Sequence, residues 1–271
     1  MILLFPIVTL GVPTMQAAIA IFDYDGGGLH NFFRALHILA GIAWIGLLYY
    51  FNVVQVPAFA AYGDEGRARN VSIDKLARRA LWWFRWAAVA TFVLGLLITG
   101  SVENYWEGFM SSDSNFNLGH NAMILVGMLL GTTMMLNVWG VIWRNQKVVL
   151  ANAANVLAGG EADPNAAGAG RSALLASRTN FIFSFSMLWF MVAAPHLGGL
   201  FDGESAGAAW AFVLIAVAIG AVIELLALGF IGGKAATNKL LWPFESHKNA
   251  MISGGVLWVV LYILSEILLN I

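Results

Sequence analysis

Residues 29–59, LHNFFRALHILAGIAWIGLLYYFNVVQVPAF, decide the fold of this chain. The stretch is long and apolar enough to cross a bilayer as a helix, yet it carries His30, Arg34 and His37. The spacings of four and three residues put all three side chains on one face of a helix. Ionisable groups in a membrane span are costly and therefore indicate a functional site. Gly41 continues this face, where the missing side chain would let a flat ligand or a neighbouring helix approach.

The composition indicates an integral membrane protein. Of 271 residues, 60% are hydrophobic and 11% charged, and the mean hydropathy is +0.77, whereas soluble domains carry about 25% charged residues. The absence of cysteine excludes disulfides, thiolate metal sites and covalent attachment of a c-type haem. The net charge of −1 gives no reason to expect a nucleic-acid partner, and the partner that the composition predicts is a lipid bilayer.

Windows of about 20 apolar residues predict an all-α, polytopic bundle of about seven transmembrane helices in a single membrane domain. The first window lacks a basic n-region and contains Pro6 and Pro13. It therefore indicates a retained, kinked helix, which spans the membrane or lies partly in the interface, rather than a signal peptide. The expected spans are Ile2–Phe22, Phe32–Val54, Leu81–Ser101, Asn121–Trp143, Phe181–Phe201, Ala209–Ile231 and Ala250–Leu269.

The charged residues alternate between the segments that connect these spans. The segments 23–28, 102–118 and 202–208 contain acids but neither Lys nor Arg. By the positive-inside rule, the N-terminus lies in the cytoplasm and the C-terminus in the periplasm of a bacterial inner membrane. All basic residues except Arg34 and Arg85 lie in the other three segments: Arg67, Arg69, Lys75, Arg78 and Arg79; Arg144, Lys147, Arg171 and Arg178; Lys234, Lys239 and Lys248.

This topology gathers four of the five histidines near the outer side of the membrane. His30 and His37 fall in the outer half of the second expected span, His120 at the outer mouth of the fourth, and His196 near the outer end of the fifth. Only His247 falls on the cytoplasmic side. Because a helix rises about 1.5 Å per residue, His37 and His196 are expected at similar depth.

Imidazoles at matching depth predict a b-type haem, which needs two axial ligands and a cation near its propionates. We expect His37 and His196 to be the ligands, Arg34 to pair with a propionate, and His120 to be the alternative ligand. His30 and His120 also have a simpler interpretation as interfacial residues, and any of these histidines could form a hydrogen bond between helices. The same four imidazoles would alternatively suit a copper or zinc site.

Two further features lie inside the expected spans. Glu224 belongs to the sixth span, where it is a candidate proton relay or a structural hydrogen-bond partner of a neighbour such as Asn137. Gly127 and Gly131 are spaced as a small-xxx-small contact, which is typical of helix packing.

The segment HILAGIAWIGLLYYF, followed by a basic segment and WWFRWAAVATFVLGLLITG, resembles the N-terminal membrane domain of the cytochrome-c-linked bacterial urate oxidases (urate hydroxylases). The likeness extends through NVWGVIWRNQK and Ser177–Asn180 to about Phe201. It implies a family-like core at 29–201, an extra helix at 1–28 and two further spans at 202–271. The likeness is best at His37, Gly41, Trp44, Gly46, Phe51, Trp83, Arg85 and Trp86.

In that family a cytochrome c module follows the membrane domain. A chain without cysteine has no such module, so the resemblance implies a stand-alone version whose electron acceptor is an external cytochrome c or another membrane subunit. We therefore expect a membrane oxidoreductase or electron-transfer subunit, urate oxidase-like, in a homo- or hetero-oligomer. A non-catalytic structural or assembly subunit is the alternative. A proton-coupled transporter is disfavoured, because paired discontinuous spans are missing.

Overall fold

The computed structural model of this chain describes residues 27–111, 113–201, 203 and 205–271, and this part of the chain is helical without strands. The predicted all-α membrane bundle is confirmed. Six continuous helices in the described part are long and apolar enough to cross a membrane: Gly28–Ala61, Gly66–Gly100, Leu118–Leu157, Ala166–Leu200, Ala206–Leu228 and His247–Leu268. The expected span Ile2–Phe22 lies outside the described residues.

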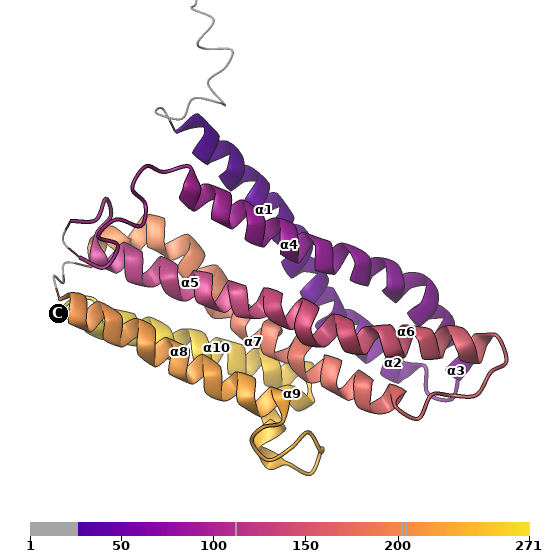
Figure 1. The fold of residues 1–271 in the computed structure, drawn as a ribbon. Coiled ribbons are helices and arrows are strands. Elements are labelled where there is room, and N and C mark those ends of the chain that lie inside the picture. The colour runs from indigo at the N-terminus through magenta and orange to yellow at the C-terminus, as the bar shows by residue number, and fades with distance from the viewer. Residues whose placement is uncertain (1–26, 112, 202, 204) are drawn as a thin grey trace, which may run out of the picture.

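Several of these helices consist of more than one element (Figure 1). Wider, π-helical turns interrupt the first three of the six long helices. The elements are α1 (Gly28–Tyr49), η2 (Tyr50–Gln55), α2 (Val56–Ala61), α3 (Gly66–Val71), η3 (Ser72–Ala77), α4 (Arg78–Gly100), α5 (Leu118–Asn137), η4 (Val138–Ile142), α6 (Trp143–Leu157), α7 (Ala166–Leu197), η5 (Gly198–Leu200), α8 (Ala206–Leu228), η6 (Lys239–Leu241), α9 (Trp242–Glu245) and α10 (His247–Leu268).

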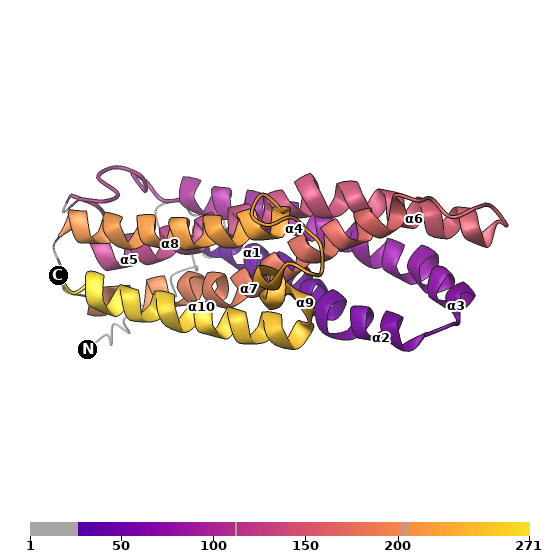
Figure 2. The same cartoon turned by 90° about the horizontal axis from the view of Figure 1, so that it is seen from below.

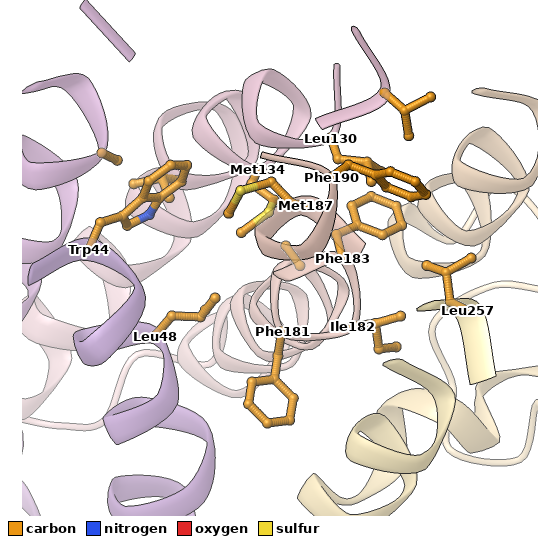
Figure 3. Packing of buried hydrophobic residues seen from close by; sticks show 14 of the residues in the cluster. Trp44, Leu48, Leu130, Met134, Phe181, Ile182, Phe183, Met187, Phe190 and Leu257 are labelled. Carbon is orange, nitrogen blue, oxygen red and sulfur yellow. The ribbon is translucent and has the colours of Figure 1, made fainter. Parts of the chain in front are cut away.

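Helix α7 is the centre of the bundle. It contacts α1, α5, α6, α8 and α10, and 56% of its apolar window is buried, more than in any other of the six described helices. Figure 3 shows side chains of α1, α5 and α10 converging on it: Trp44 and Leu48, then Leu130 and Met134, then Leu257. Gly127 of α5 lies against Met191 of α7, and Gly131 lies near Met187. The predicted small-residue packing contact is confirmed.

The first four helices are longer than the spans that hydropathy predicted. A helix of 34 residues measures about 51 Å, whereas a hydrocarbon core is about 30 Å thick. The excess lies at one end of the bundle, where α2, α3 and α6 extend beyond α8 and α10 (Figure 2). Residues 58–80, which lie between two of the expected spans, continue those spans as parts of α2, α3, η3 and α4.

Residues 166–178 form helix although they precede the expected span at Phe181. Helix α7 begins at Ala166, because the sequence AAGAGRSALLA is rich in alanine and buries Ala169, Ala173 and Leu175.

The two ends of the bundle differ in charge. The basic segments lie at the extended end, where Arg171 donates to both carboxylate oxygens of Glu245 at 3.0 and 2.6 Å, and the acidic segments lie at the other end.

Candidate functional site

His37 of α1 packs against α4 with a defined tautomer. Its Nδ1 lies 2.8 Å from the backbone carbonyl oxygen of Thr91. A carbonyl can only accept, so Nδ1 carries the hydrogen and Nε2 keeps its lone pair. Gly95 makes room for the ring, because a Cβ there would lie 3.2 Å from His37 Cε1. Gly41 also faces α4, at 3.9 Å from Thr91 Cγ2 for a Cβ in its place, so its bare face admits a neighbouring helix.

His120 at the start of α5 has the same tautomer for a different reason. Its Nδ1 lies 3.1 Å from Asn121 Oδ1. The orientation of the Asn121 amide is settled, because its nitrogen donates to Phe109 O at 2.6 Å, Ser114 Oγ at 2.8 Å and Phe116 O at 3.1 Å. The amide oxygen therefore faces His120 and accepts from Nδ1. Again Nε2 keeps a free lone pair.

The backbone at His120 is held against the end of α7. Asn117 caps α5 by accepting from the His120 N–H at 2.8 Å, and its own amide nitrogen donates to Gly198 O at 2.8 Å. Only glycine fits at position 198, because a Cβ there would lie 2.6 Å from His120 Cα. These contacts hold the backbone of His120, from which the imidazole projects, against the end of α7.

Aromatic side chains cover His120 on the acidic side of the bundle. The ring of Phe116 stacks on the imidazole with centroids 4.5 Å apart and planes 23° apart. Tyr105 lies 5.6 Å from Phe116 and is buried. Burial raises the pKa of Tyr105 to about 12, so its phenol stays neutral. This cover restricts the access of water to the ring of His120.

Arg34 supplies a positive charge beside these imidazoles. It precedes His37 by three residues on α1, and its positive charge lies close enough to His120 to act on the imidazole. Guanidinium groups bind carboxylates through paired hydrogen bonds. Arg34 and His37 thus come from α1 and His120 from α5, and both helices begin at the same end of the bundle.

The remaining histidines are placed differently. His30 is half-buried, and its Nδ1 lies 3.4 Å from Ser101 Oγ, which joins the start of α1 to the end of α4. His196, near the end of α7, is exposed. His247 begins α10 at the opposite, basic end. Of these histidines, His120 is the one whose ring interacts electrostatically with Arg34.

A site with several ligands around one ion is not found in the described part of the chain. No three His, Cys, Asp or Glu side chains there gather closely enough to hold a metal ion. The copper or zinc alternative would require such a cluster. A b-type haem needs two ligands from the protein, and His37 and His120 each keep an Nε2 lone pair that could serve as one.

Arg178 is a candidate that the sequence did not reveal. It was assigned to a basic connecting segment, but the structure buries it in α7 with 2% exposure. Its Nε and Nη1 are buried without a hydrogen-bond partner. The neighbouring Ser177 accepts from Asn52 Nδ2 at 3.0 Å, which ties α7 to η2. The signal in the sequence was the position of Arg178 near the apolar run FIFSF, from which only Thr179 and Asn180 separate it.

Glu224 of α8 belongs to a chain of buried amides. Asn137 Nδ2 donates to Glu224 Oε2 at 2.9 Å and to Asn180 Oδ1 at 3.0 Å, and Asn180 Nδ2 donates to Met134 O at 2.8 Å. The hydrogen bond between Glu224 and Asn137 is the structural role weighed above. The role of Glu224 as a proton relay stays a prediction.

Comparison with known families adds an independent finding. The family described as urate oxidase N-terminal matches residues 108–259, more than half of the chain. The match includes His120, Arg178 and Glu224 and begins after α1 and α4, which carry the segments with the strongest resemblance quoted above. No curated protein and no solved structure matches the chain. This chain belongs to the urate oxidase N-terminal family.

Proposed function

We propose that this chain is a membrane electron-transfer subunit of a urate oxidase-type oxidoreductase, which holds a b-type haem between His37 and His120. One observation carries the proposal. In both imidazoles Nδ1 donates to a fixed oxygen, of Thr91 or Asn121, so both Nε2 atoms are free to act as ligands. Histidines that bind metals commonly have this hydrogen bond on the other ring nitrogen. His120 thereby replaces His196 as the preferred second ligand.

The other residues of the site have roles that fit a bound haem. Arg34 would bind a propionate, and the rings of Phe116 and Tyr105 would keep water from the ligand His120. The haem, when bound, supplies a one-electron redox centre. With no cysteine in the sequence to attach a c-type haem, the electron would pass to an external cytochrome or a partner subunit. The family description supports urate, or a similar oxidisable substrate, as the source of electrons.

The test is a haem titration of purified protein, followed by the Soret absorption. Wild-type protein is expected to bind haem stoichiometrically. H37A and H120A are expected to lose tight binding, because each removes one axial ligand. H196A serves as the matched control, since it removes an exposed histidine at the same end of the bundle, and it is expected to bind like wild type. Unchanged binding in both H37A and H120A would refute the proposal. Loss in H196A and not in H120A would refute the assignment of His120.

A structural or assembly subunit is the second candidate, and the hydrogen bond between His37 and Thr91 favours it, because it joins α1 to α4. In this case H37A would lower the temperature of unfolding, and the protein would bind no haem at any concentration. The H37A variant thus distinguishes the two functions. If His37 is a haem ligand, H37A changes the haem absorption spectrum. If His37 only joins α1 to α4, there is no haem spectrum to change.

A further inference from the structure

Arg85 of α4 lies inside an expected membrane span and is the only charged residue between Leu81 and Ser101. Among the described residues, its guanidinium forms neither a hydrogen bond nor an ion pair. The contact that it does make is with an aromatic ring, since its Cζ lies 3.8 Å from the centroid of the Trp143 ring. Arg85 is half-buried, and unlike Arg178 it has no nitrogen that is closed off from its surroundings. Arg85 therefore offers hydrogen-bond donors that an acceptor outside the protein can reach.

Tryptophans hold Arg85 in place between α4 and the helix formed by η4 and α6. Trp139 Nε1 donates to the backbone carbonyl oxygen of Arg85 at 3.2 Å. Trp86 packs against Trp139 with ring centroids 5.4 Å apart. A guanidinium stacked on an aromatic ring, as Arg85 is on Trp143, keeps its N–H groups at its edges, where they can bind a phosphate through paired hydrogen bonds. Arg85 is thus positioned by contacts with both helices, and the edge of its guanidinium is free.

The depth of Arg85 matches that of phospholipid headgroups. It follows Leu81 by four residues and so lies about 6 Å inside the start of the expected span, from where a long side chain reaches back to the interface. Trp82, Trp83 and Trp86 are 46%, 62% and 46% exposed. Exposed tryptophans are typical of the boundary between hydrocarbon and headgroups. The surface around Arg85 therefore faces lipid at the level of the phosphate groups.

This surface carries positive charge without compensation. The sequences of α4, η4 and α6 contain neither Asp nor Glu. Arg144, the residue after Trp143, and Lys147, three residues further along α6, are exposed and form no ion pair with any described residue. A zwitterionic ligand would leave this charge unbalanced, whereas an anionic ligand compensates it.

We propose that the surface formed by Arg85, Trp143 and Arg144 binds the phosphodiester of an anionic phospholipid, with the guanidinium of Arg85 donating paired hydrogen bonds to two phosphate oxygens. Because the site lies towards the basic end of the bundle, the positive-inside rule assigns this lipid to the cytoplasmic leaflet. The site includes neither His37 nor His120, so the proposal does not depend on the haem.

The experiment measures binding of dioleoylphosphatidylglycerol to the full chain in detergent, by native mass spectrometry. R85Q removes the charge and the paired donors and is expected to weaken binding at least about tenfold. R67Q is the matched control, since it removes an arginine charge that is exposed on α3, outside the proposed site. It is expected to bind within about twofold of wild type. Equal affinity of R85Q and R67Q would overturn the proposal.

The chemistry of the ligand is tested with wild-type protein. Dioleoylphosphatidylcholine is expected to bind at least about threefold more weakly than dioleoylphosphatidylglycerol, and dioleoylglycerol, which lacks the phosphate, at least about tenfold more weakly. Equal affinity for either lipid and dioleoylphosphatidylglycerol would contradict an anionic phospholipid site. Displacement of the lipid by an equal concentration of inorganic phosphate would identify a site for free phosphate instead. If R85Q fails to fold, this comparison of lipids still decides.

Discussion

At the scale of single residues, Arg178 has the least favourable environment that the structure describes for a charge. It is 2% exposed, and its Nε and Nη1 have no partner. A buried donor without an acceptor costs about 1–3 kcal/mol. Replacing even a paired set of buried charges by apolar residues of similar size is often neutral or stabilises a protein by about 1–4 kcal/mol, and Arg178 lacks such a partner for Nε and Nη1. R178M is therefore expected to raise the melting temperature of the ligand-free protein in detergent.

The control for this prediction is R171M on the same helix. Arg171 forms a partly exposed ion pair with Glu245, so its loss should lower stability by about 0–1 kcal/mol. A melting temperature that falls in R178M by more than in R171M would contradict the prediction and would mean that an acceptor pairs with Arg178.

The candidate site could be predicted only in part at this scale. The stripe of His37 and Arg34 followed from helical spacing, since both residues lie on one helix. The choice between His120 and His196 did not, because it depends on how α5 and α7 are rotated about their axes. Asn117 and Gly198 take part in this packing through contacts that join residues far apart in the sequence.

At the scale of helices, the contact between α5 and α7 depends on Gly127. A Cβ at this position would lie 3.2 Å from the backbone nitrogen of Met191, which cannot move aside easily. G127L should therefore push the two helices apart and destabilise the bundle by about 1–3 kcal/mol or more. The measurement is the melting temperature in detergent. G140L is the control, because Gly140 has nothing within 4 Å of a Cβ; an equal effect of both variants would contradict this account.

The existence of the helices was predictable, but their ends were not. Hydropathy detects the part of a helix in hydrocarbon, and α3 and α6 lie beyond it with polar and basic residues, while α2 continues the first span with the short segment VPAFAA. The π-helical turns η2, η3 and η4 also have no periodic pattern in the sequence, since each widens a single stretch of a helix. In η2 the following Pro57 gives a physical reason, because its ring would clash with the carbonyl of Val53 in a regular helix.

At the scale of the whole molecule, the described helices alternate in direction, and the charged segments separate by sign between the two ends. The positive-inside rule therefore predicts that the end with Glu161 faces the cytoplasm and the end with Glu107 faces outward. The absence of native cysteine makes single-cysteine labelling straightforward. E107C should react with a membrane-impermeant maleimide in intact cells, and E161C only after lysis. The reverse pattern would contradict the predicted orientation.

The central claim is that His37 and His120 are the two axial ligands of a b-type haem. The electron paramagnetic resonance spectrum of the oxidised protein, purified from membranes supplied with haem, tests it most directly. The account predicts the low-spin signal of a haem with two imidazole ligands, which becomes high-spin in H37A and in H120A and persists in H196A. A low-spin signal that survives in both H37A and H120A, or wild-type protein without any haem signal, would contradict it.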